Sequence, residues 1–206
     1  MKNIVITSAK RTPIGKFMGG FGSLSAIELG ALVLEEIIKD SKLTKDQIDE
    51  VILGQVLTGG SGQNPARKTS CLTNIPDSKS ALTINQVCGS GLRAISLGAQ
   101  SIMTGQSDIV LAGGQESMSN AHHTANLRNG IKMGDGQMKD SMIIDGLWCA
   151  MNDYHMGITA ENVAEKYKIN KDQQDQFAAN SQIKAEKAQK NDRFKDEIVP
   201  VKIKKK

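Results

Sequence analysis

The amino-acid sequence predicts an α/β protein built on a mostly parallel sheet with helices on both faces. Short β-branched runs alternate with segments of helical apolar spacing from the first residues to about residue 114. Residues that cap helices or favour turns stand between these segments. With 206 residues, of which 39% are hydrophobic and 23% charged, the chain is long enough to bury a core.

The first strand is expected at residues 3–7, which read NIVIT. Ser25 can cap the helix that follows, because apolar residues recur after it at helical spacing: Ile27, Ala31, Leu34 and Ile38. Thr44 can cap a short turn before the next strand, at 51–57, which ends in the flexible sequence TGGSGQ. Together these segments predict one strand, one helix and a second strand.

Asn64 and Pro65 can begin a helix that continues through Cys71, because Pro fits the first helical position. The remaining elements of this half are expected to be a strand at 81–85, a helix at 89–103 and a strand at 109–112. Their alternation is what predicts a parallel sheet.

Residues 115–154 differ in character, being rich in Met, Asn, Gly and His without sustained periodicity. Such a segment is typical of a long functional loop. After it, we expect Thr159 to open a short helix. Asn170 and Gln173 resemble a capping box for a long, solvated helix that ends near Lys190.

Composition argues against several classes of protein. Four of the last five residues are Lys, and they account for the whole formal charge of +4, so the body of the chain does not resemble a nucleic-acid binder. No apolar stretch has the length of a membrane span and the first residues do not resemble a signal peptide, so we expect a cytoplasmic protein without a membrane partner. Three widely separated cysteines suggest neither a disulfide framework nor a metal site: Cys71, Cys88 and Cys149. Cys71 and Cys149 are expected to be inert packing residues, since neither has a basic neighbour or lies at a helix N-terminus.

Cys88, in the sequence NQVCGSGL, is the candidate nucleophile. It is expected in the tight connection between the strand at 81–85 and the helix at 89–103. The amino end of a helix favours a thiolate, and its unpaired N–H groups can hold an oxyanion. Gly89 and Gly91 are expected to leave room beside the sulfur for a thioester. The alternative is a small buried hydrophobe in a Gly-rich turn, and the local chemistry leaves both open.

The sequence INQVCGSGLRAI resembles the nucleophile segment of the thiolase family of acyl-CoA C-acyltransferases. Four other segments are similar to successive parts of that family in the same order: KRTPIGKFMGG, GQNPAR, DIVLAGGQESMS and YHMGITAENVA. The resemblance covers nearly the whole chain, and Gly directly after the Cys is more similar to the biosynthetic branch. It implies the N-terminal half of a layered thiolase-like fold, with a core domain at 1–116 carrying the nucleophile and part of an inserted loop domain at 117–206.

The resemblance also implies further site residues. His155 and Met156, with Leu147 upstream, match positions that line the channel for the pantetheine arm of coenzyme A. The alternative for this pair is a structural His beside a core Met. His122 and His123 are expected to be solvated. They lie within a segment from about 120 to 138 that resembles the family's tetramerisation loop, so burial against a partner subunit is the alternative.

The implied reaction condenses two acetyl-CoA to acetoacetyl-CoA, or runs in reverse as thiolysis, through an acetyl-Cys88 intermediate. Coenzyme A is then a substrate or product, no separate cofactor is needed, and a homo-oligomer, dimer or tetramer, is expected. The family's activating His and second catalytic Cys belong to a C-terminal half outside these 206 residues, so we expect this chain alone to be inactive. Two alternatives stay open: a non-catalytic module that binds coenzyme A or oligomerises, and a hydrolase of acyl thioesters that uses His155 as its base.

Overall fold

The computed structural model describes residues 3–203 and divides the chain into two compact units. Unit 1 comprises Met1–Gly146 and Val199–Lys206, and unit 2 comprises Leu147–Ile198. The boundary near residue 116 that the sequence suggested lies inside unit 1, and it stays a prediction about the domains of the whole protein. Each unit is described separately below.

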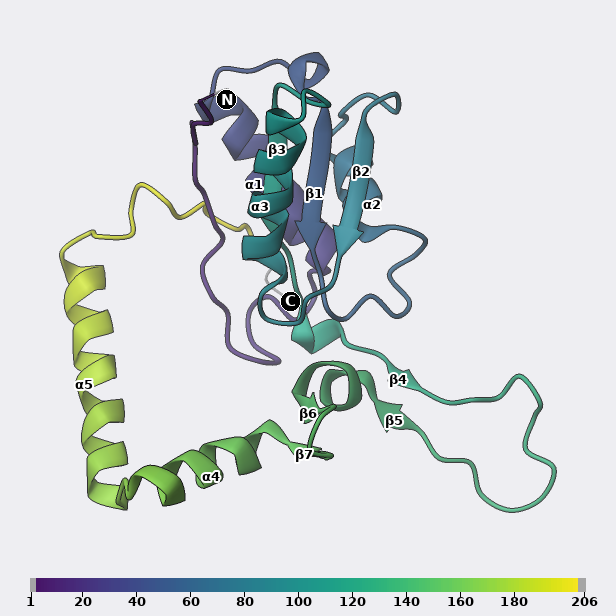
Figure 1. Cartoon of the computed structure of the whole chain (residues 1–206), viewed down its shortest axis with the longest axis vertical. Coiled ribbons are helices and arrows are strands. Elements are labelled where there is room, and N and C mark those ends of the chain that lie inside the picture. Colours follow the sequence, from purple (N-terminus) through teal and green to yellow (C-terminus); the bar gives the residue numbers. More distant parts are fainter. Residues whose placement is uncertain (1–2, 204–206) are drawn as a thin grey trace. The chain divides into compact units, whose positions relative to one another are not determined.

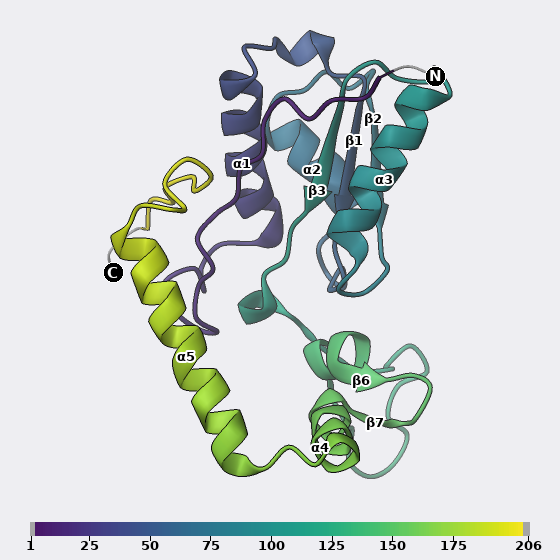
Figure 2. The same ribbon diagram turned by 60° about the vertical axis from the view of Figure 1, so that its left-hand side comes forward.

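A three-stranded parallel sheet forms the centre of unit 1, with the strand order β2-β1-β3. Its strands and the three longer helices of the unit, drawn in Figure 1, are α1 (Ala26–Asp40), β1 (Glu50–Gly54), α2 (Pro65–Leu72), β2 (Ser80–Ile84), α3 (Ser90–Met103) and β3 (Val110–Gly114). In the view of Figure 2, α1 and α2 lie on one side of the sheet and α3 on the other. The α/β class and the helices on both faces are thereby confirmed.

Predicted caps begin these helices. The side chain of Ser25 accepts a hydrogen bond from the Glu28 amide, and the Ser25 amide donates to the Glu28 carboxylate. Asn64 caps α2, with Pro65 as its first residue. A 3-10 turn at Lys45–Gln47 follows Thr44, as predicted. Local sequence therefore determines where the elements of this half begin.

The main core lies between the sheet and the α1/α2 layer. One face of β1 and apolar residues from α1, α2, β3 and the connections form it: Leu34, Ile38, Ile48, Val51, Leu53, Ala66, Ile75 and Leu111. Burying each of the larger side chains contributes about 1.5–3 kcal/mol. On the other face, α3 approaches β3 closely at Gly98, where an added Cβ would lie 3.0 Å from Val110 Cγ1. The helix that follows Cys88 is thus packed directly on the sheet.

The prediction of a strand at 3–7 is wrong. Residues 3–10 are extended but form no ladder, and the side chains of Val5 and Ile6 are 74% and 76% exposed. A β-branched sequence favours a strand only where a neighbouring strand and a half-buried surface are available. Within residues 3–203, no strand pairs with this segment.

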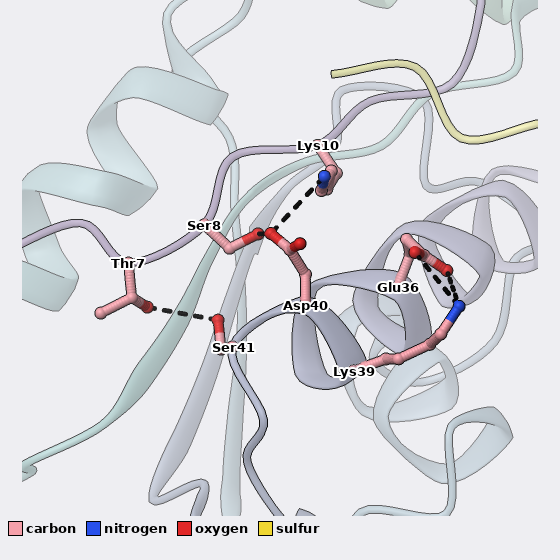
Figure 3. Close-up of polar contacts among 7 residues, drawn as sticks. All are labelled: Thr7, Ser8, Lys10, Glu36, Lys39, Asp40 and Ser41. Atoms are coloured by element: carbon pink, nitrogen blue, oxygen red, sulfur yellow. Dashed lines mark hydrogen bonds and ion pairs between the residues drawn. The ribbon is translucent and has the colours of Figure 1, made fainter. Parts of the chain in front are cut away.

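Side-chain contacts attach this N-terminal segment to the end of α1 instead (Figure 3). The Ser8 hydroxyl donates to Asp40 Oδ2 at 2.6 Å, and Lys10 Nζ lies 3.5 Å from the same oxygen. Thr7 and Ser41 share a hydroxyl hydrogen bond at 3.3 Å. The Ser8 hydrogen bond, aided by Lys10, lowers the pKa of Asp40 below its usual range, so the tether is present at neutral pH.

The excursion after β3 contains only short pieces of regular structure within unit 1. These are a 3-10 turn at Met118–Asn120, the paired strands β4 (His123–Thr124) and β5 (Lys139–Asp140), and a π-helix at Met142–Leu147 whose last residue already belongs to unit 2. Between β4 and β5 the chain is irregular, as the sequence predicted for this stretch.

Unit 2 contains a short hairpin and two helices: β6 (Trp148–Cys149), β7 (Tyr154–His155), α4 (Met156–Tyr167) and α5 (Lys171–Lys190). The capping box of Asn170 and Gln173 and the exposed surface of α5 agree with the prediction. The start predicted for α4 is wrong, since the helix begins at Met156 rather than near Thr159. His155 caps it, and a histidine is not among the residues by which a cap is usually recognised. None of the helices within residues 3–203 is long and apolar enough to cross a bilayer.

Candidate functional site

Cys88 lies in the short turn between β2 and α3, two residues before the helix begins. Because the three strands are parallel, their carboxyl ends meet at one edge of the sheet, and the turn stands at that edge. The residue is exposed. The structure therefore does not support the alternative of a buried structural cysteine.

Hydrogen bonds close this turn tightly. The hydroxyl of Ser90 accepts from the Gln86 amide at 2.8 Å and donates to the Val87 carbonyl at 2.6 Å. The amide of Val87 donates to Asn85 Oδ1 at 2.8 Å, and the Gly89 amide donates to the Gln86 carbonyl at 3.1 Å. Cys88 is consequently held by bonds on both sides of it.

The strained residue of the turn is Val87, which has a φ of 49°. Positive φ is rare for a β-branched residue, because its side chain crowds the neighbouring carbonyl. Gly89, which follows Cys88, has an ordinary helical φ of −81°. The conformational strain of the turn is therefore in the residue before the cysteine, which the sequence did not indicate.

Glycines at the ends of β1 and β3 allow α3 to pack closely on the sheet. An added Cβ on Gly54 would lie 2.5 Å from Ser90 Cβ, and one on Gly114 would lie 3.3 Å from Gly91 Cα. The first distance is too short for any side chain, so the first turn of α3 rests directly on the backbone of β1 and β3. The backbone of Gly91 takes part in this close packing against Gly114, and its expected role in leaving room beside the sulfur stays a prediction.

This arrangement suits nucleophilic chemistry on a thioester. Gly89, the residue before α3, has no side chain to cap the helix. The amino end of α3 and its dipole therefore remain available to a negative charge, on sulfur or on an oxyanion. An exposed thiol beside such a helix end can act as an acyl acceptor.

Two residues that sequence reasoning missed follow β3 directly. Glu116 Oε2 accepts hydrogen bonds from the amides of Val56 and Leu57, at 2.8 and 3.2 Å. Gln115, 7% exposed, donates through Nε2 to Gln55 Oε1 at 2.9 Å and accepts from the Thr69 hydroxyl at 2.8 Å. A carboxylate and an amide placed just past a Gly-Gly strand end were the signal that could have identified them.

The other predicted site residues all belong to unit 2. Trp148 pairs with His155 in the β6–β7 hairpin, and extending this register by one residue sets Leu147 opposite Met156. His155 Nδ1 accepts the Gly157 amide at 3.0 Å, so in the neutral ring the proton is on Nε2. Leu147 is half-buried, whereas His155 and Met156 are exposed. These three residues lie at the open end of the β6–β7 hairpin, whereas Cys88 belongs to unit 1.

Cys149, predicted to be inert, has a polar environment in the hairpin turn. Asn152 Nδ2 donates to its sulfur at 3.3 Å. This bond, with the amides of Met151 and Asn152, lowers the pKa of the Cys149 thiol below its usual range. The missed signal was a short turn able to supply N–H donors without any basic residue.

His122 and His123 are exposed, as predicted. His122 also makes a contact that the sequence did not indicate, because its Nδ1 lies 2.8 Å from the Gly59 carbonyl oxygen. Within residues 3–203, no group of three or more His, Cys, Asp or Glu side chains could hold a metal ion.

Comparison with known proteins gives consistent results. The sequence profile described as "Thiolase, N-terminal domain" matches residues 4–206. The chain is 57% identical over 203 residues to an acetyl-CoA acetyltransferase of Allochromatium vinosum, covering 98% of this chain and 52% of the relative. It is 55% identical over 204 residues to an acetyl-CoA acetyltransferase of Paracoccus denitrificans, covering 99% of this chain and 52% of that relative.

A solved structure is similar as well. It is that of the Acat5 thiolase from Ascaris suum in complex with coenzyme A, with a TM-score of 0.90 and 44% identity. The match covers 95% of this chain and 51% of that one. The chain therefore spans about half the length of the relatives it matches.

Proposed function

The chain belongs to the thiolase family, and from that premise we propose that the protein is an acetyl-CoA C-acetyltransferase. The reaction is the condensation of two acetyl-CoA to acetoacetyl-CoA, or its reversal by thiolysis. The observation that carries the proposal is the exposed Cys88 at the amino end of α3. The names of the relatives, which are acetyl-CoA acetyltransferases, support the same substrate.

In the proposed reaction, the Cys88 thiolate attacks the carbonyl carbon of acetyl-CoA. A carbon–sulfur bond to the enzyme forms, and the coenzyme A thiolate leaves. A second acetyl-CoA then loses a proton from its α-carbon, and the resulting carbanion attacks the acetyl group on Cys88. A carbon–carbon bond forms and the Cys88 thiolate departs, leaving acetoacetyl-CoA.

Groups outside residues 1–206 complete this cycle in the proposal. A His activates Cys88, and a second Cys takes the α-proton of the second substrate. Within residues 1–206, the amino end of α3 stabilises the thiolate and the developing oxyanion. This division gives the N-terminal half the acyl acceptor and the C-terminal half the bases.

Leu147, His155 and Met156 are proposed to contact the pantetheine arm of the substrate. Two apolar side chains suit the carbon chain of that arm. The Nε2–H of neutral His155 supplies a donor for an amide carbonyl, because Nδ1 is already engaged with the Gly157 amide. His155 thereby has both a capping role in α4 and a proposed binding role.

The remaining proposals concern the whole protein. We propose a core domain at 1–116 with a loop domain from 117 onward, a homo-oligomer, either dimer or tetramer, and a cytoplasmic location. Coenzyme A takes part as substrate and product, with no other cofactor.

Brief incubation with radiolabelled acetyl-CoA, followed by denaturation and peptide mapping, tests the function. Label is expected on Cys88 and absent from the Cys88→Ser variant. The variants Cys71→Ser and Cys149→Ser are matched controls that should retain the label. Label on another residue would overturn the proposal, and stable acetyl-CoA binding without label would favour the non-catalytic module.

A further inference from the structure

Two carboxylates bridge the neighbouring strands β1 and β3, one at each end. At the amino ends, Asp49 Oδ2 accepts from the amides of Asp108 and Ile109 at 2.8 and 3.0 Å. At the carboxyl ends, Glu116 Oε2 accepts from the amides of Val56 and Leu57 at 2.8 and 3.2 Å. Both bridges use one carboxylate oxygen and two successive backbone amides, and Asp49 additionally pairs through Oδ1 with Lys79 Nζ at 3.6 Å.

Only the Glu116 bridge lies at the end of the sheet where α3 is seated. Val56 is two residues beyond Gly54, and Glu116 is two residues beyond Gly114. These are the glycines whose backbone contacts Ser90 and Gly91. Asp49 directly precedes β1, at the opposite end of the strand pair from the Cys88 turn.

We infer that Glu116 is a positioning residue for Cys88, an inference that rests on the proposed acyl-transfer function. Gly54 and Gly114 are partners in the parallel ladder, and the Gln115 amide donates to the Gly54 carbonyl at 2.9 Å. By holding the segments that follow β1 and β3 together, Glu116 keeps this end of the ladder closed, and with it the distance between the two glycines. This distance sets how the first turn of α3 is seated, and Ser90 then holds the turn that contains Cys88 through Gln86 and Val87.

The buried network beside Glu116 supports the same role. Gln55, Thr69 and Gln115, 2%, 0% and 7% exposed, are linked by hydrogen bonds just past the ends of β1 and β3. Gly30 of α1 makes room for the network, since an added Cβ would lie 2.1 Å from Gln115 Oε1. This end of the sheet is thus held by side chains from several elements. Buried polar networks with satisfied partners make a structure rigid.

The test compares two matched pairs of variants in the full-length protein, which includes the C-terminal half that the proposed function requires: Glu116→Ala with Glu116→Gln, and Asp49→Ala with Asp49→Asn. Each amide keeps an acceptor oxygen for the two backbone N–H groups. Glu116 Oε1 has no hydrogen-bond partner among the described residues, so the amide nitrogen displaces no bond there. The rate of acetyl transfer from acetyl-CoA to Cys88 is measured against substrate concentration, alongside the urea midpoint of unfolding.

Glu116→Ala is expected to lower the maximal acetylation rate about 10- to 100-fold, as a small misplacement of a reacting group does. The half-saturating concentration of acetyl-CoA should not change, and Glu116→Gln should restore most of the rate. Asp49→Ala should lower the urea midpoint of unfolding about as much as Glu116→Ala does. Its acetylation rate should stay close to that of the wild type. If Glu116→Ala fails to fold, Glu116→Asp replaces it, since its carboxylate is one methylene further from the amides.

The inference is overturned if Glu116→Ala acetylates Cys88 at the wild-type rate. It is equally overturned if Asp49→Ala slows acetylation as much as Glu116→Ala does. If the wild-type full-length protein itself takes no acetyl group, the proposed function fails instead. In that case the rate of Cys88 alkylation by iodoacetamide in the same variants tests the positioning alone, and equal rates in all of them would overturn it.

Discussion

At the scale of single residues, the strained backbone of Val87 directly precedes Cys88, the proposed nucleophile. Val87 has positive φ and a side chain that is 47% exposed, so little burial offsets the unfavourable backbone. Non-glycine residues in this region cost about 1–3 kcal/mol and persist where the surroundings impose them. Here the Asn85 side chain and the Ser90 hydroxyl impose the conformation.

Substituting Val87 with Gly is expected to raise the free energy of unfolding by about 0.5–1 kcal/mol, because relief of strain exceeds the entropy that glycine adds to the unfolded chain. Val163→Gly is the matched control, since Val163 lies in the helix α4 and is similarly exposed, at 44%. That control should lower stability. Urea denaturation measures the free energy of unfolding of both variants. An equal loss of stability in the two would contradict the strain argument.

At the scale of elements, carboxylates fix how adjacent strands meet. The amides of Asp108 and Ile109, with Lys79, hold the pKa of Asp49 below its usual range. A depressed pKa means that the folded state binds the proton less well than the unfolded state. The stabilisation is therefore present above the unfolded pKa of about 3.9 and is lost as pH falls through the folded value.

Asp49→Asn is accordingly expected to be less stable than wild type at pH 7, by an amount that stays constant down to about pH 5. The difference should shrink below about pH 3.9, where the wild-type carboxylate also takes up its proton. Urea denaturation across this range measures it. Asp46→Asn removes an exposed carboxylate nearby and controls for net charge. A difference that grows as the pH falls would contradict the mechanism.

Elements that depend on local signals were predictable from the sequence, and those that depend on distant partners were not. Ser25, Asn64 and Asn170 cap helices through bonds within three residues, which a sequence displays directly. The strand expected at 3–7 needed a neighbour that local sequence does not specify. Cys88 was identifiable from its motif. Glu116 could have been noticed just past a Gly-Gly strand end, but its bonding partners could not, because the amides that it binds lie 59 and 60 residues away.

At the scale of the whole molecule, the two units differ in how their helices are supported. The helices of unit 1 bury residues against the sheet, whereas α4 and α5 contain no buried residue. Phe177 and Ile183 of α5 are 78% and 61% exposed. An isolated helix of this kind is marginal in water. The stability of unit 2 therefore depends on its helix caps and its hairpin rather than on a buried core between α4 and α5.

A polypeptide limited to residues 1–206 is expected to turn over acetyl-CoA at least about 10²-fold more slowly than a full-length family member, because a general base contributes about 10²- to 10⁴-fold. A coupled assay for acetoacetyl-CoA formation measures this. A full-length relative with its second catalytic Cys replaced is the control. Turnover by residues 1–206 equal to that of the full-length enzyme would show that the bases lie within them.

The position of β1 between two later strands has a consequence for synthesis on the ribosome. Its partners in the sheet, Ser80 for Glu50 on one side and Val110 on the other, emerge 30 and 60 residues afterwards. At about 5–20 residues per second, β1 waits about 3–12 s for its second neighbour. During that interval the apolar sequence Val51–Leu53 lacks its pairing with β3. The nascent chain is then most exposed to misassociation, and a chaperone that binds short apolar segments would act at this moment.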